Sequence, residues 1–306
     1  MGKSIQGLAQ QLSHILSPYQ NEGPLLAKIL RTSIKTTILL CPPPDEDTSE
    51  YRQDTSLLPI GWLGGSPRMP KSMRWPETRQ GEKLLFIAQL DFGTLSKLAI
   101  EAPQAFPANT MEDLPNTGSL ILFRTAGRAR ENIKDRYGFA LLYTKEAIDS
   151  EHMREVTGGS VSPVAQPLYP RASFSCPLDN LWLDKLLNEN FPHLTSDLVL
   201  KQNLMAWFNT FYECATEGAL GHIRSVSRND LDTLQHMASF SASGVGFSET
   251  RKDDWHYKHL AQEAANFELL FSFVEKDNAC VDCIMMRQED LKERLFERAW
   301  LFCRPT

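Results

Sequence analysis

A dense succession of glycines and prolines between positions 57 and 80 constrains the fold of this 306-residue chain more than any other sequence feature. Proline fixes φ and removes a backbone donor, while glycine tolerates conformations that other residues avoid, so long regular elements are excluded here. We predict an ordered loop that Trp62 and Trp75 hold against the core. Its glycines and prolines are Pro59, Gly61, Gly64, Gly65, Pro67, Pro70 and Pro76.

Regular elements are predicted on both sides of this loop. Apolar residues at helical spacing indicate two helices, Ile5 to Leu16 and Leu25 to Leu30, and a β-rich run at 34–40 indicates a strand. Further strands are expected at 84–90, 119–123, 139–143, 267–274, 281–286 and 298–303. Further helices are expected at 94–100, 178–188, 198–214, 229–238, 253–265 and 289–294, and residues 163–177 form a second Pro-rich passage.

Charge is distributed unevenly along the chain. Lys and Arg number 32 and Asp and Glu number 38, which gives a formal net charge of −6. This balance disfavours a protein that coats nucleic acid or an anionic membrane, and it favours a cationic partner. The densest acidic segment follows the first strand and is predicted to be an exposed loop. Its carboxylates are Asp45, Glu46, Asp47, Glu50 and Asp54.

Other sequence features bear on where the protein resides and on what it contacts. The first residues lack an apolar core of signal-peptide length, and no window approaches the about 20 apolar residues that span a bilayer. The 6 cysteines are scattered, which suits a reducing compartment. The one basic cluster, between Arg124 and Arg136, lacks interleaved aromatic residues that stack bases. We therefore expect a cytoplasmic protein without membrane or direct nucleic-acid contact.

Two constellations have the spacing of metal ligands. Cys280 and Cys283 form a single C-x-x-C in a strand pattern, which sends the two side chains to opposite faces and favours a structural role. His256, His259 and Glu263 share one face of a predicted helix, but their neighbours are those of an ordinary amphipathic surface. We predict no metal, no cofactor and, because hydrolase motifs are missing from the sequence, no catalytic residue.

The run from Ile60 to Pro70, followed by Trp75-Pro76 and by the strand pattern Leu84 to Asp91, resembles the signature of the YwqG-like family, a bacterial domain of unknown function. Segments 114–123 and 288–301 are similar to two looser motifs of the same family. The resemblance covers about residues 57–303. It departs from the family pattern at 220–223 and 272–275, where polar residues usual in relatives are missing here.

The resemblance implies an α+β fold with two similar halves and no agreed catalytic activity. A weak repeat supports two halves, because Leu84 to Asp91 and Leu269 to Lys276 are both strand patterns entered by Leu-Leu-Phe, although so short a match also arises by chance. We expect mostly antiparallel sheets flanked by helices in one compact unit. An N-terminal segment (1–56) would precede a YwqG-like domain (57–303) with halves at about 57–160 and 178–303.

The resemblance also implies a genomic context, since members are often encoded beside toxins of interbacterial competition. We therefore hypothesise an immunity protein that binds and neutralises a cognate toxin, plausibly a basic nuclease effector of a contact-dependent system such as type VI secretion. Acidic side chains would attract the toxin. The carboxylates at 45–54 are the first candidates, a solvated loop being the alternative interpretation. The second set is Glu146, Asp149, Glu151 and Glu155.

A small-ligand or enzymatic module is the competing hypothesis. Its site would be a groove between the two halves, near Gln89 and Asp91. A structural role is favoured for Gln89, because an amide at a strand end pairs with loop peptides that burial would otherwise leave without partners. The sequence therefore predicts a tether at Gln89 and retains ligand binding as the alternative.

Overall fold

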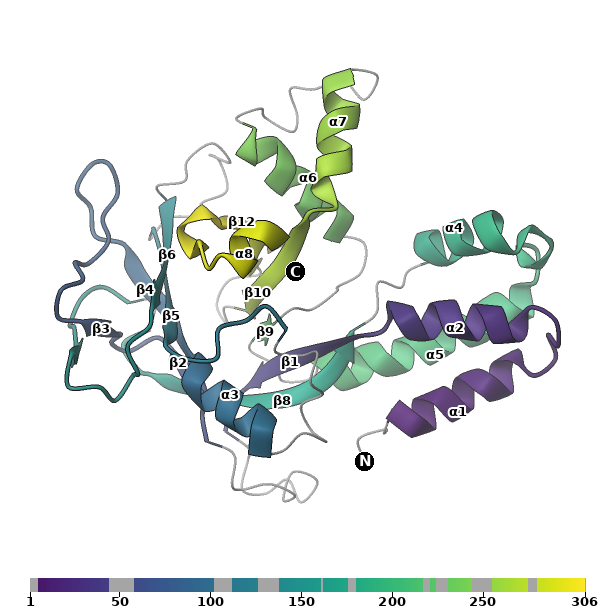
Figure 1. Ribbon diagram of the computed structural model, residues 1–306, viewed down its shortest axis with the longest axis horizontal. Helices are drawn as coiled ribbons and strands as arrows, with labels where there is room; N and C mark the ends of the chain where they lie inside the picture. The colour runs from purple at the N-terminus through teal and green to yellow at the C-terminus, as the bar shows by residue number, and fades with distance from the viewer. Residues whose placement is uncertain are drawn as a thin grey trace.

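Ten strands form one sheet in the computed structural model, which describes residues 5–43, 58–101, 112–125, 138–160, 162–175, 180–216, 221–223, 231–243, 255–274 and 280–305. The strand order is β12-β11-β10-β9-β1-β8-β2-β4-β5-β6, and all neighbouring strands are antiparallel. Figure 1 shows the sheet together with the helices that flank it. The strands are β1 (Lys35–Cys41), β2 (Gly61–Leu63), β4 (Leu85–Asp91), β5 (Ser119–Arg124), β6 (Phe139–Thr144), β8 (Gln166–Ser175), β9 (Gly221–Ile223), β10 (Phe267–Val274), β11 (Cys280–Arg287) and β12 (Trp300–Pro305).

Strands β1 and β8 join two blocks of the sheet. The first block consists of β2, β4, β5 and β6, and the second consists of β9, β10, β11 and β12. Strand β8 pairs with β2 through residues 166–168 and with β1 through residues 169–175, while β1 also pairs with β9. The predicted division at residue 57 therefore passes through one continuous sheet, because the N-terminal segment contributes a central strand.

The largest apolar cluster lies between the inner faces of the two blocks. Alternate residues of β5 and β11, such as Leu120, Leu122, Ile284 and Met286, belong to it, as the two-residue period of a strand requires. At the edge of this core, aromatic rings from the two blocks meet. The ring of Tyr143 in β6 contacts the ring of Phe296, which precedes β12, and the two ring centroids lie 5.2 Å apart. The two blocks therefore share one core. The rings that meet at this edge are Phe92, Tyr143, Phe271 and Phe296.

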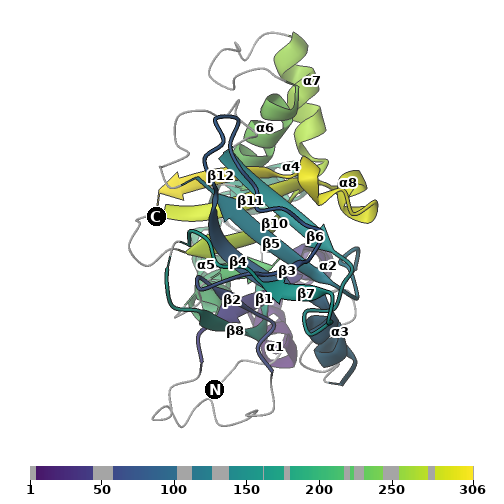
Figure 2. The ribbon, with the colours of Figure 1, turned by 90° about the vertical axis from the view of Figure 1, so that its left-hand side faces the viewer.

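Each block has its own cover on the outer face. The predicted Gly- and Pro-rich loop covers the first block, with Trp62 and Trp75 packed on its apolar cluster, which confirms the expected anchoring. This loop contains β3 (Arg68–Pro70), which pairs with β7 (Met153–Glu155) in a separate ribbon (Figure 2). Helices α6 (Leu231–Ala242) and α7 (Trp255–Ala264) lie on the side of the second block, where α6 packs on β10 and β11.

A layer of helices projects from the sheet on the side opposite the first block (Figure 1). It has an apolar cluster of its own, in which Leu12, Leu26, Leu187 and Leu204 are buried. The layer combines the N-terminal segment with the middle of the chain. Its helices are α1 (Ile5–Leu16), α2 (Gly23–Ser33), α4 (Asn180–Asn190), the 3-10 helix η4 (Pro192–Leu194) and α5 (Leu198–Thr216).

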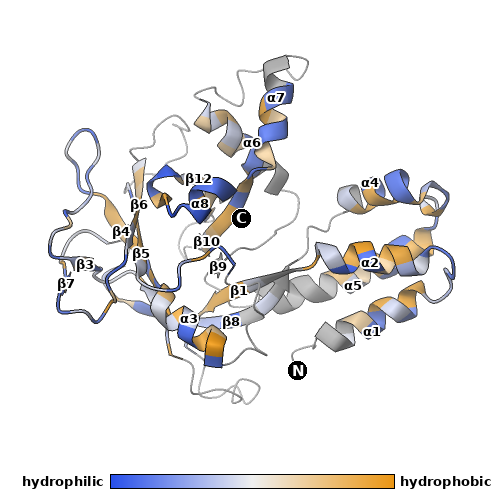
Figure 3. Ribbon diagram, in the orientation of Figure 1, coloured by the Kyte–Doolittle hydropathy of each residue, from blue (hydrophilic) through white to orange (hydrophobic). Residues whose placement is uncertain are grey.

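Three short helices complete the described part of the chain: α3 (Phe92–Glu101) after β4, and α8 (Gln288–Lys292) and the 3-10 helix η6 (Phe296–Arg298) between β11 and β12. Apolar colouring follows β4 and β5, whereas α8 is hydrophilic (Figure 3). The expected α+β class with mostly antiparallel sheets and flanking helices is confirmed. No helix within the described ranges is long and apolar enough to cross a membrane.

Candidate functional site

An acidic connection, residues 145–155, follows the edge strand β6. The second predicted set of carboxylates lies within it, and all four side chains are exposed. Two of them have a neighbour within the connection: Glu146 accepts a 3.4 Å hydrogen bond from Ser150 Oγ, and Glu151 lies 3.9 Å from His152. Because solvent surrounds these groups, a partner can reach them without any rearrangement of the core. The four residues are Glu146, Asp149, Glu151 and Glu155.

Basic side chains accompany the acidic connection. Lys145 and Arg154 lie within it, both exposed, and Arg68 of β3 pairs in register with Glu155 of β7. The backbone of Lys71 donates to the carbonyl of His152 at 2.9 Å, which fixes the end of the connection against β3. The surface is therefore acidic along the segment from 146 to 151 and mixed at β7.

The first predicted acidic set lies outside the described residues, since Asp45, Glu46, Asp47, Glu50 and Asp54 all fall within 44–57. The basic cluster predicted from Arg124 onward lies largely outside them as well, within 126–137.

Gln89 lies on β4, beneath the Gly- and Pro-rich loop, and its side chain is fully buried. Its amide oxygen accepts a hydrogen bond from the backbone N–H of Arg68 at 2.8 Å, and its amide nitrogen donates to the Arg68 carbonyl at 2.9 Å. The same nitrogen donates to Ser119 Oγ at 3.0 Å. These contacts join β3 to β4 and β5, which is the tether that the sequence predicts.

Asp91, the last residue of β4, immediately precedes helix α3. Its carboxylate accepts a hydrogen bond from the backbone N–H of Gly93 at 2.9 Å and another from Thr94 Oγ1 at 2.6 Å. These are the contacts of a helix N-terminus, where free backbone donors require acceptors. Gln89 and Asp91, the two candidates of the ligand-groove hypothesis, therefore both form hydrogen bonds that stabilise the fold.

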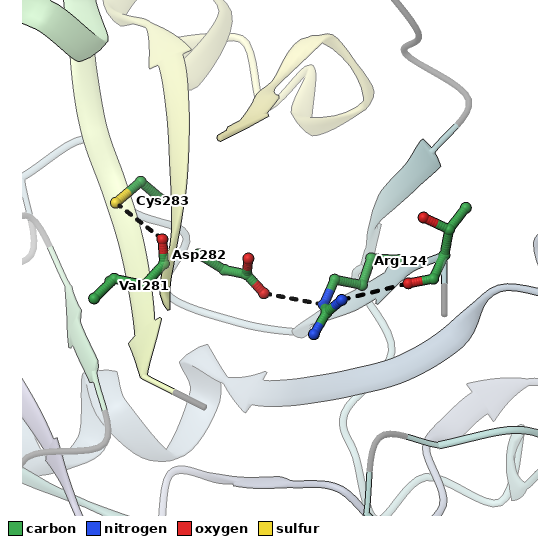
Figure 4. A network of polar contacts seen from close by, with 5 residues as sticks. Arg124, Val281, Asp282 and Cys283 are labelled. Carbon is green, nitrogen blue, oxygen red and sulfur yellow. Dashed lines mark hydrogen bonds and ion pairs between the residues drawn. The ribbon is translucent and has the colours of Figure 1, made fainter. Parts of the chain in front are cut away.

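An ion pair between Arg124 and Asp282 connects the two blocks across the inner face (Figure 4). Arg124 Nε lies 3.1 Å from Asp282 Oδ2, and the side chains are only 10% and 11% exposed. Arg124 also donates to the Thr125 carbonyl at 3.4 Å. Opposite charges so far from water attract strongly, so the pair holds the end of β5 against β11.

Local sequence patterns do not predict this pair, because Arg124 belongs to the basic cluster and Asp282 lies inside C-x-x-C. One signal was present: a single carboxylate within the otherwise apolar strand pattern 281–286 requires a partner. Arg124 is likewise a charged residue next to an apolar strand pattern, because it directly follows residues 119–123. The cross-block pairing itself depends on tertiary structure.

The two constellations with the spacing of metal ligands lie on separate elements, the cysteines on β11 and the histidines on α7. Cys283 is buried on the outer face of β11, and its thiol lies 3.8 Å from the Val281 carbonyl. His259 is exposed on α7. Among the side chains that the structure describes, no three His, Cys, Asp or Glu residues come together as metal ligands.

A comparison with family profiles covers both blocks of the sheet. The sequence profile of DUF1963, a domain of unknown function, matches residues 62–304, which is most of the chain. This protein belongs to the DUF1963 family. The match is consistent with the YwqG-like resemblance of its loop and strand motifs. A comparison with curated proteins finds no match.

The DUF1963 match begins at Trp62 in β2, so α1, α2 and β1 precede it. Nevertheless, Ile38, Leu39 and Leu40 of β1 are completely buried. The matched region therefore includes both blocks of the sheet but omits the strand that lies between β8 and β9.

Proposed function

We propose that this DUF1963 protein is a cytoplasmic immunity protein, which binds a cognate antibacterial toxin and neutralises it by direct contact. The toxin is basic, such as a nuclease effector delivered by type VI secretion. One observation carries the proposal: the acidic connection presents Glu146, Asp149 and Glu151 to solvent within six residues of chain. Exposed carboxylates attract a cationic protein from a distance and accelerate its association.

Two further observations support a protein partner over a small ligand. The polar side chains at the predicted groove, Gln89 and Asp91, are engaged by Arg68, Ser119, Gly93 and Thr94. The formal net charge of −6 favours a cationic partner at long range. Steering sets the association rate, while apolar side chains at the interface would supply most of the affinity.

Charge reversal tests the role of the acidic connection. We expect lysine at Glu146, Asp149 and Glu151 to slow association with the purified product of the adjacent toxin gene roughly tenfold at low salt, because the steering field is removed. Stopped-flow kinetics at several salt concentrations measure this effect. The control reverses Glu82, Glu101 and Glu189, which are also exposed, and so changes the net charge equally.

The outcome separates local steering from net charge. Equal slowing by both triple variants would mean that overall charge alone matters, and unchanged kinetics in both would remove the acidic connection from the proposal. The same reversal at Asp45, Glu46 and Asp47 tests the other acidic segment.

A further inference from the structure

The outer edge of strand β6 is the second feature of this surface, and the strand continues directly into the acidic connection. In the strand order, β6 ends the first block, with β5 as its only neighbour among the described strands (Figure 2). An edge strand offers backbone donors and acceptors to any extended chain that approaches it.

The register identifies the backbone groups that point away from β5. The N–H of Thr125 donates to the carbonyl of Gly138 at 2.8 Å, so these two residues form a hydrogen-bonded pair. Pairs alternate along an antiparallel ladder, so Ala140 and Leu142 also bond to β5. The N–H and C=O groups of the intervening residues, Phe139, Leu141 and Tyr143, are therefore directed outward.

No partner for these outward groups is found among the described residues. Helix η6 approaches β6, but the contact is made by side chains: the rings of Tyr143 and Phe296 lie 5.2 Å apart on the inner face. The side chains of Phe139 and Leu142 are partly exposed as well. The edge thus combines available hydrogen-bonding groups with apolar surface.

The opposite edge of the sheet has features that discourage pairing. Strand β12 ends with Arg304 and Pro305, and charge and proline are the usual means by which natural sheets protect an edge. Strand β6 has the sequence Phe-Ala-Leu-Leu-Tyr-Thr, which contains neither. The contrast indicates that the β6 edge is kept suitable for pairing.

We infer that β6 receives an extended segment of the toxin as an additional strand of the sheet. This inference rests on the proposed function and names the surface and the binding mode. The toxin segment would alternate apolar side chains and would carry lysine or arginine at the end beside Thr144, where the exposed carboxylates of Glu146 and Asp149 outnumber the one exposed cation, Lys145. Main-chain hydrogen bonds would provide affinity, and these charges would set orientation.

Amide hydrogen exchange in the complex tests the binding mode directly. The probe is the product of the adjacent toxin gene, purified as an inactive variant. The amides of Phe139, Leu141 and Tyr143 should gain protection on binding, whereas Ala140 and Leu142, which already bond to β5, should change little. A complex that forms without added protection at these three amides would overturn the inference and leave the proposed function standing. Absence of any complex would instead contradict the proposed function.

A matched pair of substitutions separates backbone from side chain. Phe139→Pro and Phe139→Val both remove the ring, but only proline removes the outward N–H, and position 139 begins the strand, where proline is tolerated. We expect F139P to weaken toxin binding about tenfold relative to F139V, since the interface then contains an acceptor without its donor. Equal affinities, with equal melting temperatures, would contradict strand addition. A homodimer that F139P dissociates would assign the edge to a second copy and would also overturn the inference.

Discussion

Buried polar side chains hold this fold together at the scale of single residues. Gln89 connects the irregular loop to β4 and β5, and Arg124 connects the first block to Asp282 of the second. In each case a polar group removed from water has partners inside the protein, which avoids the cost of burying it alone. The two contacts act at different places, Gln89 on the outer face and Arg124 on the inner face.

Substitution of Arg124 by methionine should destabilise the protein by about 3–5 kcal/mol, because Asp282 then remains buried without its counter-charge. The double variant Arg124→Met with Asp282→Leu should recover much of this loss. Urea unfolding measures both values.

The matched control is Arg298→Met, which removes the exposed arginine of the Arg298–Asp290 pair and should cost at most about 1 kcal/mol. Strictly additive effects of the two substitutions at 124 and 282 would mean that the buried pair does not couple the blocks.

Single residues differ in how well the sequence predicts them. The role of Gln89 follows from local chemistry, because a Gly- and Pro-rich loop next to a strand leaves backbone groups that need partners. The partner of Arg124 could not be predicted, because it lies 158 positions further along the chain, at Asp282. The curvature of the sheet brings these two side chains together, and a local sequence pattern does not predict that curvature.

At the scale of elements, the helical layer depends on a contact between its two parts. Asp197 precedes α5 and accepts a 2.9 Å hydrogen bond from the backbone N–H of Leu200, as helix-capping residues do. The hydroxyl of Tyr19, which follows α1, donates to the other carboxylate oxygen at 2.6 Å. The hydrogen bond from Leu200 is the main cause that lowers the pKa of Asp197, and burial together with Asp197 raises the pKa of Tyr19 to about 12.

The pH dependence of unfolding should report this contact. Because the pKa of Asp197 is lower in the folded state, its stabilisation is present above the ordinary value of 3.8 and is lost as the pH falls through the lowered value. Because the pKa of Tyr19 is raised, its stabilisation is present below 10.0 and is lost as the pH rises toward about 12.

Urea unfolding of Asp197→Ala measures the loss of stability in acid, and urea unfolding of Tyr19→Phe measures the loss at alkaline pH. The deficit of D197A, about 0.5–2 kcal/mol at neutral pH, should shrink in acid. Wild type should lose more stability than Y19F between pH 10 and 12, because only wild type carries the hydroxyl whose pKa is raised in the folded state. Parallel curves for wild type and Y19F in that range would contradict this assignment.

Some elements could be predicted and others could not. Strands β4, β5, β10 and β11 were expected because their apolar patterns are continuous. Strand β8 lies in the Pro-rich passage 163–177, for which no strand is predicted. Strand β8 changes its neighbour between residues 168 and 169. Pro167 lies before this point and faces Trp62 of β2, and Pro170 lies after it and faces Leu40 of β1. Each proline therefore pairs with one strand among those described. Proline is compatible with a strand at such positions.

At the scale of the whole molecule, the two blocks have the same pairing pattern. Gly61 and Leu63 of β2 face Leu90 and Ala88, while Gly221 and Ile223 of β9 face Phe273 and Phe271. The register of β4 shifts between Phe86 and Ala88, and that of β10 shifts between Leu269 and Phe271. Superposing the two ladders places Ala88 at the position of Phe271. The Leu-Leu-Phe motifs instead align Phe86 with Phe271, which differs by two residues. A common origin of the halves stays a prediction.

The central position of β1 leads to a prediction about truncation. A chain that begins at residue 58 retains the whole DUF1963 match but lacks α1, α2 and β1. It should not unfold cooperatively, because β8 and β9 lose the strand between them and the completely buried Ile38, Leu39 and Leu40 are missing. Calorimetry measures this, with residues 5–306 as the control. A sharp transition in the 58–306 chain would show that the N-terminal segment is dispensable for the fold.

We propose that this protein neutralises a toxin by binding it. The most direct measurement titrates the purified chain into the active product of the adjacent toxin gene, while toxin activity and heat of binding are followed together. We expect a one-to-one complex in which toxin activity is lost at the equivalence point. Full toxin activity in the presence of excess folded protein, or recovery of a tightly bound metabolite in place of any complex, would contradict it.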